Sequence, residues 1–291
     1  GAIVHLALGA DPREMQIMCA RGDPLRWWPL CAILSTVSND DVVVSPVLIV
    51  GAGPTGLVLA LWLTRLGVRV RIIDKASQPG TTSRALAVQA RTLEFYQQIG
   101  IVDEVIRGGV KIPHLAFWVR GARAAQVPLA RIGSGLTPYP FALVFPQDAH
   151  EQLLIERLAS LGVQVERETV LVELTQRDQV VQVKLRAGNG AEEICDVGYV
   201  AGCDGASSTV RAQLGIGFPG GTYTGLFYVA DVEGSGAGSD YNTTVDLEDA
   251  DFLLVFPLRE KGHFRLVGNV RDGSADDRRE ISFDDVRGKA V

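Results

Sequence analysis

The sequence predicts an α/β fold, with a Rossmann-like three-layer domain that carries an inserted β meander and a second domain formed by a β-sheet. Three observations support this fold class. A buried strand, a glycine turn and a helix follow one another over residues 47–66. A run of strand-like segments over residues 163–197 then precedes a short strand and turn at Tyr199–Gly205. The last strand-like segments, from Leu226 to Val270, are separated by Gly, Ser and Asp rather than by helices, which is typical of a separate sheet.

Composition indicates a globular chain without a nucleic-acid or metal function. Its 291 residues are 47% hydrophobic, which is enough for one large domain or two ordinary ones. The net charge of −6 comes from 28 basic and 34 acidic residues with no basic block, so the electrostatic footprint of a nucleic-acid-binding protein is missing. The four cysteines form no C-x-x-C pair and the histidines lack metal-ligand spacing, so we expect a reduced, cytoplasmic setting and no metal site.

Two N-terminal stretches need separate interpretations. Residues 1–41 have no clear period and no signal-peptide order, and we expect an extension of uncertain relevance that forms a loosely ordered tail. Residues 42–63 contain no charge over about the length that crosses a bilayer. Because the glycine turn lies in the middle of this second stretch, a strand followed by a buried helix explains its apolar content, and we expect no membrane span.

The glycine turn has the pattern of a dinucleotide-binding unit. Strand residues Val47–Val50 lead into Gly51, which makes the tight turn, Gly53, which lets the backbone approach a pyrophosphate, and Gly56, which lets the helix pack closely. The N-terminus of the helix then faces the phosphates with unpaired N–H groups. A glycine turn without a ligand is the alternative interpretation.

The next segments support the dinucleotide interpretation. The helix Thr55–Leu66 is closed by Gly67, and the strand Val68–Ile73 ends in Asp74. An acid at this strand end accepts hydrogen bonds from a ribose diol, which favours a dinucleotide whose adenosine ribose has no 2′-phosphate.

The remaining elements are predicted from the spacing of apolar residues and from the turn and capping residues that bound each segment. We expect helices over Val88–Ile99, with Leu93, Tyr96 and Ile99 toward the core, over a short stretch through Ile106, and over Gln147–Leu161, Ser207–Leu214 and a capped start at Ser282–Val286. We expect strands over Leu115–Val119, Ala124–Leu129, Phe141–Phe145, Val163–Glu166, Val170–Leu174, Val180–Leu185, Glu192–Val197, Leu226–Val232, Thr243–Leu247, Phe252–Phe256 and Phe264–Val270. Asn189-Gly190 is a hairpin turn signal, and Lys75–Arg84 is a loop.

Three further motifs lie at informative distances from the glycine turn: Ser83–Glu94, Pro146–Leu153 and Gly202–Arg211, the last of which contains D-G-x-x-S-x-V-R. Together with G-x-G-x-x-G they resemble the flavoprotein aromatic hydroxylases, the single-component FAD monooxygenases typified by para-hydroxybenzoate hydroxylase. The loops are closer to those of phenol and polyketide hydroxylases. The resemblance covers residues 44–291 and implies an FAD-binding domain over 42–115 and 141–220 and a substrate domain over 116–140 and 221–291.

The resemblance also implies residue roles. Arg84 would contact the FAD pyrophosphate, although an exposed loop cation is the alternative, and Gln147 would reach the ribityl region. Asp204 and Gly205 match the turn near the middle of the cofactor, while Arg211 pairs with an acid or supports that turn. The expected cofactor-binding residues are therefore Gly51, Gly53, Pro54, Thr55, Gly56, Asp74, Lys75, Arg84, Gln147, Asp204 and Gly205.

The implied chemistry is aromatic hydroxylation. NADH or NADPH would reduce FAD, and a flavin C4a-hydroperoxide formed with O₂ would transfer oxygen to a small aromatic, phenolic or polyketide-like substrate. Such chemistry needs a closed apolar chamber. Phe252, Leu254 and Phe256 are its candidate residues, with a simple role in the sheet core as the alternative. No side chain stands out as a general base, so no catalytic residue is named.

The sequence also departs from the family pattern. A second flavin motif, Gly-Asp, does not follow Phe264, and Asp272-Gly273 has the reverse order, so we expect a chain truncated before the second half of its FAD site. Other FAD-superfamily oxidoreductases, such as an epoxidase or a reductase, remain alternatives, as does a non-catalytic flavin-binding remnant. The tryptophan-rich W-x-W-x-I-P element of halogenases is not found, and a nicotinamide dehydrogenase would not explain Asp204-Gly205 after a meander.

Overall fold

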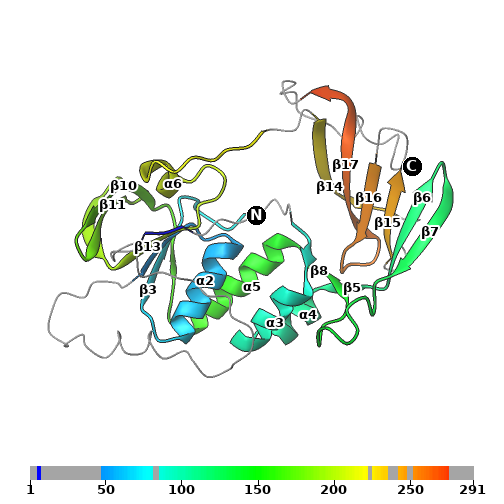
Figure 1. Cartoon of the computed structure of the whole chain (residues 1–291), viewed down its shortest axis with the longest axis horizontal. Helices are drawn as coiled ribbons and strands as arrows, with labels where there is room; N and C mark the ends of the chain where they lie inside the picture. Colours follow the sequence, from blue (N-terminus) through cyan, green and yellow to red (C-terminus); the bar gives the residue numbers. More distant parts are fainter. Residues whose placement is uncertain are drawn as a thin grey trace. The chain divides into compact units, whose positions relative to one another are not determined.

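The chain folds into two compact units in this computed structural model (Figure 1), which describes residues 5–7, 47–80, 85–221, 225–234, 242–247 and 252–274. The first unit comprises Gly1–Gln78 and Leu161–Ile216, and the second comprises Pro79–Ser160 and Gly217–Val291. The two units are defined by which residues pack together. The predicted domains are instead defined by which parts of the chain would bind the cofactor and which would bind the substrate, so the units do not test them. The predicted boundaries, 42–115 with 141–220 and 116–140 with 221–291, therefore stay a prediction.

The first unit is built on a five-stranded sheet with strand order β1-β13-β2-β3-β9. Strands β2 (Val47–Val50), β3 (Val70–Ile73), β9 (Val165–Glu166) and β13 (Tyr199–Gly202) run parallel, and β1 (His5–Ala7) is antiparallel to β13. Helix α2 (Pro54–Arg65) connects β2 to β3. The carboxyl end of β2 thus leads directly into the glycine turn.

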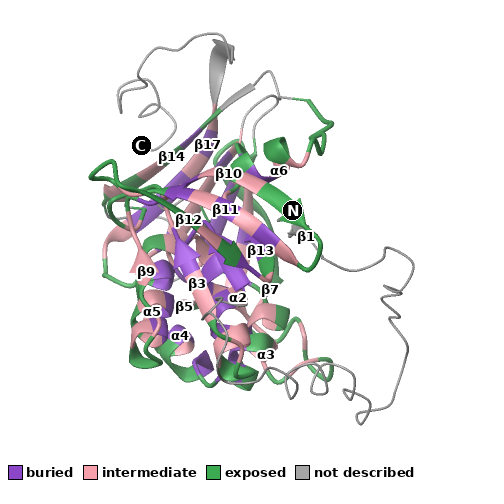
Figure 2. Ribbon diagram, turned by 90° about the vertical axis from the view of Figure 1, so that its left-hand side faces the viewer, coloured by how far each residue is buried: buried purple, intermediate pink, exposed green. Residues whose placement is uncertain are grey.

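This unit has three layers. The meander, with strands β10 (Val170–Arg177), β11 (Val180–Arg186) and β12 (Glu192–Val197), packs on one face of the sheet. Its central strand β11 alternates buried and half-buried residues (Figure 2). Leu48 and Val50 belong to the core shared with the meander, whereas Ile49 alternates to the other face, and α2 buries Leu57 and Leu61. Figure 1 shows α2 beside this sheet. The predicted α/β fold with three layers and an inserted meander is therefore confirmed.

The second unit combines helices with two sheets. Its helices are α3 (Ala90–Ile99), α4 (Val102–Gly108) and α5 (Gln147–Ser160), and its small sheet has the order β4 (Ala87–Val88), β8 (Ala142–Val144) and β5 (Val110–Ile112). The large sheet has six strands in the order β14 (Gly225–Glu233), β17 (His263–Ser274), β16 (Phe252–Pro257), β15 (Thr243–Leu247), β6 (His114–Val119) and β7 (Ala122–Pro128). The predicted β-sheet of the second domain is thus present.

A buried polar pair joins two helices of the second unit. The hydroxyl of Tyr96 on α3 lies 2.7 Å from Nε2 of His150 on α5, and the ring of Phe145 packs beside His150 with 5.3 Å between centroids. Burial lowers the pKa of His150 to about 4 and raises the pKa of Tyr96. His150 is therefore neutral at physiological pH. Leu93, Tyr96 and Ile99 are all buried, as their spacing predicts.

Most predicted elements are confirmed within a few residues, and three points differ from expectation. The helix expected from Val88 begins at Ala90, because Val88 pairs with Leu143 as part of β4. Strand β5 was missed because three residues are too few to show alternation. Among the described residues, no helix combines the length and the apolar character needed to span a bilayer. His5–Ala7 were expected in a loosely ordered tail but form β1, because their backbone pairs with the free edge of β13. The helix start at Ser282–Val286 and the rest of the extension 1–41 lie outside the described residues.

Candidate functional site

A hollow of about 270 Å³ in the first unit opens at the glycine turn. It lies where the turn after β2, the end of β3, the start of the meander and the turn after β13 meet. Its lining residues are Val50, Gly51, Gly53, Asp74, Lys75, Thr169, Val170, Leu171, Cys203, Asp204, Gly205 and Thr209. The structure thus gathers Gly51, Gly53, Asp74, Lys75, Asp204 and Gly205 from the predicted cofactor residues, although they come from distant parts of the sequence.

The three glycines of the turn meet different steric demands. Gly51 has a φ of +104°, and a Cβ there would lie 2.4 Å from the carbonyl oxygen of Cys203. A Cβ on Gly56 would lie 2.0 Å from the carbonyl oxygen of Gly51. A Cβ on Gly53, by contrast, would meet nothing within 4 Å. Gly51 and Gly56 are therefore required by packing, whereas Gly53 keeps the hollow open.

The start of α2 presents unpaired amide donors. Pro54 is the first helical residue and has no N–H, while the amides of Gly51 and Ala52 donate to Ile73 and Asp74. Within the described part of the chain, the amides of Gly53, Thr55 and Gly56 donate to no acceptor. Orphan N–H groups at the positive end of a helix dipole are suited to an anion such as a pyrophosphate.

Asp74 ties the turn to the neighbouring strand. Its Oδ2 accepts from the Ala52 amide at 2.7 Å and its Oδ1 from the Ala76 amide at 2.8 Å. Since an ionised carboxylate offers about four lone-pair positions, two remain for a ribose diol. Arg167 lies beside it, with Nη1 4.0 Å from Oδ1, and Nη2 of this guanidinium is buried without a partner among the described residues.

Asp204 organises the turn after β13. Its Oδ1 accepts from the Ser208 hydroxyl at 2.5 Å and its Oδ2 from the Thr209 amide at 2.6 Å, at the start of α6 (Thr209–Gln213). Arg211 donates to the carbonyl oxygens of Ala206 at 2.6 Å and Gly205 at 3.4 Å, so its expected role in supporting this turn is confirmed. The carboxylate of Asp204 therefore shapes the wall of the hollow, and its contact with ribityl hydroxyls stays a prediction.

Cys203 lies in the same wall as a free thiol. Burial, and then the nearby Asp204 carboxylate, raise the pKa of Cys203 to about 11. The thiol is therefore protonated at neutral pH and lacks the thiolate character of a nucleophile.

Two predicted residues belong to the second unit. Gln147 is the first residue of α5; its Oε1 accepts from the Ala85 amide at 3.2 Å, and its Nε2 donates to Glu151 Oε1 at 2.7 Å. Glu151 is only 6% exposed, so the amide of Gln147 is held in one orientation. Arg84 lies outside the described residues. The cofactor contacts of both residues stay predictions.

Sequence reasoning missed part of the lining of the hollow. Thr169, Val170 and Leu171 reach it because the first meander strand packs against the glycine turn, and nothing local in the sequence signals that contact. Cys203 and Thr209 lie within the Gly202–Arg211 motif, and this position could have identified them as lining residues. Among the described residues, no three His, Cys, Asp or Glu side chains gather as a metal site.

Comparison with known proteins gives a consistent result. The FAD binding domain family matches residues 44–290. The chain is 38% identical over 234 residues to 6-methylpretetramide 4-monooxygenase of Streptomyces rimosus, covering 79% of this chain and 41% of that protein. It is 38% identical over 176 residues to dialkyldecalin synthase of Streptomyces rugosporus, covering 60% of this chain and 35% of that protein. The crystal structure of p-nitrophenol 4-monooxygenase PnpA from Pseudomonas putida DLL-E4 superposes with a TM-score of 0.74 at 26% identity, covering 85% of this chain and 61% of that one. The chain spans less than half the length of these two curated relatives.

Proposed function

This chain belongs to the FAD binding domain family of flavoprotein monooxygenases, and from this we propose that the whole protein hydroxylates an aromatic, phenolic or polyketide-like substrate with FAD, O₂ and NADH or NADPH. The observation that carries the proposal is the hollow at the glycine turn, which Gly53 lines without filling it, at the start of a helix whose Gly53, Thr55 and Gly56 amides have no acceptor among the described residues. These residues fit the pyrophosphate and ribose of FAD. The fold and the family agree with that fit.

The first unit supplies binding and orientation. The amides of Gly53, Thr55 and Gly56 hold the pyrophosphate, and Asp74 accepts from the ribose diol with its two remaining lone-pair positions. Lys75 adds a positive charge at the same opening. FAD, when bound, supplies electron transfer from the nicotinamide and the activation of oxygen. The protein contributes position, polarity and the exclusion of water.

The second unit supplies an apolar surface. The large sheet buries Tyr228, Leu253 and Leu266 on one face, which is its own core. Phe252, Leu254 and Phe256 alternate with Leu253 and therefore point to the opposite face. This pattern supports the predicted chamber for Phe252 and Leu254.

The same face carries further apolar side chains that are unusually open. Phe227 packs against Phe252 with 6.0 Å between ring centroids, yet Phe227 is 53% exposed and Val229 is 46% exposed. Phe256, in contrast, packs against the cluster of Leu86, Ile112 and Val144, which is closer to the sheet-core alternative. An open apolar face of this kind is suited to an aromatic ligand.

A second candidate function has its own support. One relative is named a synthase rather than a monooxygenase, so an FAD-dependent reaction other than hydroxylation is the alternative. A flavin-binding chain without turnover is the second alternative.

For the cell location we propose the cytoplasm, in keeping with the free thiols of Cys195 and Cys203.

The test is spectroscopic and catalytic. We expect the whole protein to bind FAD, with perturbed flavin absorbance, and a phenol to stimulate NADH or NADPH oxidation and to gain one oxygen atom, detected by mass spectrometry. Bound flavin with substrate-independent or non-oxygenating chemistry would favour the second candidate. Failure to bind FAD at all would overturn the assignment of the glycine turn.

A further inference from the structure

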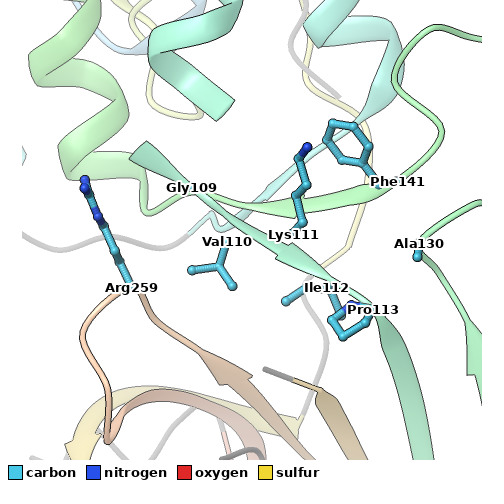
Figure 3. A pocket seen from close by; sticks show the side chains of 8 residues that line it. All are labelled: Gly109, Val110, Lys111, Ile112, Pro113, Ala130, Phe141 and Arg259. Atoms are coloured by element: carbon cyan, nitrogen blue, oxygen red, sulfur yellow. The ribbon is translucent and has the colours of Figure 1, made fainter. Parts of the chain in front are cut away.

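Basic side chains lie beside two hollows of the structure, in different surroundings. Figure 3 shows the hollow along strand β5 in the second unit, where the exposed side chains of Lys111 and Arg259 stand at the rim. Since an exposed cation can meet many anions, these two identify no ligand of their own. Arg167 in the first unit differs, because only 19% of its side chain is exposed and it lies beside Asp74, which lines the hollow at the glycine turn. Its charge therefore acts on one defined neighbour.

The backbone holds Arg167 against the end of β3. The amide of Asp74 donates to the last carbonyl oxygen of β9 at 2.9 Å, and the amide of Thr169 donates to the carbonyl oxygen of Asp74 at 3.0 Å. Between them, Glu168 has a φ of +53°, a left-handed conformation that is uncommon for a residue other than glycine. The amide of Glu168 donates to the carbonyl oxygen of Ala76 at 3.2 Å. The turn between β9 and β10 is thus fixed on both sides of Arg167.

The guanidinium of Arg167 attracts the carboxylate of Asp74 without hydrogen bonding to it. Its Nη1 lies 4.0 Å from Oδ1, a distance at which opposite charges attract but an N–H group does not donate. The lone pairs that the Ala52 and Ala76 amides leave on Asp74 are therefore not used by Arg167. In the described part of the chain, Arg167 is the only cation that forms an ion pair with Asp74.

Packing alone does not explain this arginine. Nη2 of Arg167 is buried and has no acceptor among the described residues, which costs free energy. An apolar side chain of similar length would avoid that cost, since a buried ion pair is often no more stabilising than an apolar replacement. The unsatisfied donor thus points to a role for the charge of Arg167 rather than for its bulk.

We propose that Arg167 is a positioning residue that holds the Asp74 carboxylate toward the adenosine ribose of FAD and so sets a preference for ribose over deoxyribose. The inference rests on the function proposed above, in which Asp74 accepts from the ribose diol. Because a guanidinium stays charged, it stabilises one orientation of the carboxylate and leaves the lone pairs of Asp74 to the two ribose hydroxyls. Arg167 does not line the hollow, so it acts through Asp74 and not on the ligand.

The test compares ADP, which carries the ribose and pyrophosphate of the adenosine half of FAD, with 2′-deoxy-ADP, which lacks one hydroxyl. In calorimetric titrations of the cofactor-free whole protein, ADP should bind at least about tenfold more tightly than 2′-deoxy-ADP. In Arg167→Gln and in Arg167→Met this preference should fall to about threefold or less. Arg177→Gln is the matched control and should keep the full preference, because Arg177 is an exposed arginine of the meander that does not line the hollow.

A double variant separates action through Asp74 from an effect on the fold. Adding Arg167→Gln to Asp74→Asn should weaken ADP by no more than about twofold further, whereas independent contributions would add. A full preference for ADP in both Arg167 variants, additive losses in the double variant, or loss of folding in both Arg167 variants would overturn the positioning role alone. An original protein that fails to bind ADP, or that binds both nucleotides equally, would contradict the function proposed for Asp74 as well.

Discussion

Replacing Gly53 by valine separates binding from folding more cleanly than any other change at the glycine turn. Gly53 has φ −78° and ψ −178°, an extended conformation that β-branched residues favour, and a Cβ there meets nothing within 4 Å. The substitution therefore costs neither backbone strain nor steric overlap in the protein alone. Its side chain instead enters the hollow of about 270 Å³ where the pyrophosphate is expected.

The magnitude follows from the donors that would lose contact. Moving the pyrophosphate away from the amides of Gly53, Thr55 and Gly56 removes the equivalent of one charge-assisted hydrogen bond, which is worth about 1.5–3 kcal/mol. Since 1.4 kcal/mol corresponds to about tenfold in affinity, we expect Gly53→Val to weaken FAD by about 10- to 100-fold. The melting temperature of the cofactor-free protein should stay within about 2 °C of the original.

The assay is a fluorescence titration of cofactor-free protein with FAD, with thermal unfolding followed by circular dichroism. Gly220→Val is the matched control: Gly220 is exposed, a Cβ there also meets nothing within 4 Å, and it does not line the hollow. Equal FAD affinity in the original and Gly53→Val proteins would refute the placement of the pyrophosphate. A lowered melting temperature in the absence of FAD would refute the steric argument.

Three further predictions test the turn, a residue outside the described part and a buried pair. Gly56→Ala should destabilise the protein by about 3 kcal/mol in urea unfolding, because its Cβ would lie 2.0 Å from a carbonyl oxygen; unchanged stability would contradict that close packing. Arg84→Ala should weaken FAD about tenfold with the melting temperature unchanged, and unaltered affinity would remove Arg84 from the site. His150 has a folded-state pKa of about 4 against 6.5 when unfolded, so the unfolded chain binds the extra proton first, and stability present above pH 6.5 falls by up to about 3 kcal/mol as the pH drops to 4. His150→Gln should flatten this dependence in urea unfolding measured between pH 6.5 and 4, and an unchanged slope would argue against a neutral buried His150.

The elements that the sequence predicted best are those whose conformation is determined by residues close to them in the chain. The glycine turn is set by steric limits at Gly51 and Gly56, and both limits involve atoms that the motif itself brings together. The helix over Ala90–Ile99 shows its buried face in its own spacing. Strand β4 and strand β5 were not recognised because each is defined by pairing with β8, whose paired residues lie 30 or more positions away in sequence. Long-range pairing of two or three residues leaves no period to detect.

The candidate site shows the same division. Sequence named Gly51, Gly53, Asp74 and Asp204, and the structure brings them to one hollow. It did not name Thr169–Leu171, since their contribution comes from how the meander packs, nor the unpaired Nη2 of Arg167, since burial at that position depends on the whole unit. Residues that lie within a sequence motif could therefore be predicted, whereas residues that reach the pocket through tertiary packing could not.

The two acids of the site explain why the motif is more specific than its glycines. Asp74 accepts from the amide of Ala52 and so joins the turn after β2 to the end of β3, while Asp204 accepts from the amide of Thr209 and so fixes the turn after β13. Each carboxylate satisfies backbone donors of its own turn, and among the described residues the amides of Gly53, Thr55 and Gly56 at the start of α2 are left without an acceptor. Without Asp74 the Ala52 amide would have no acceptor in the described part of the chain, and without Asp204 the same would hold for the Thr209 amide. A glycine fingerprint alone therefore predicts a turn, and the same fingerprint with both acids predicts a binding site.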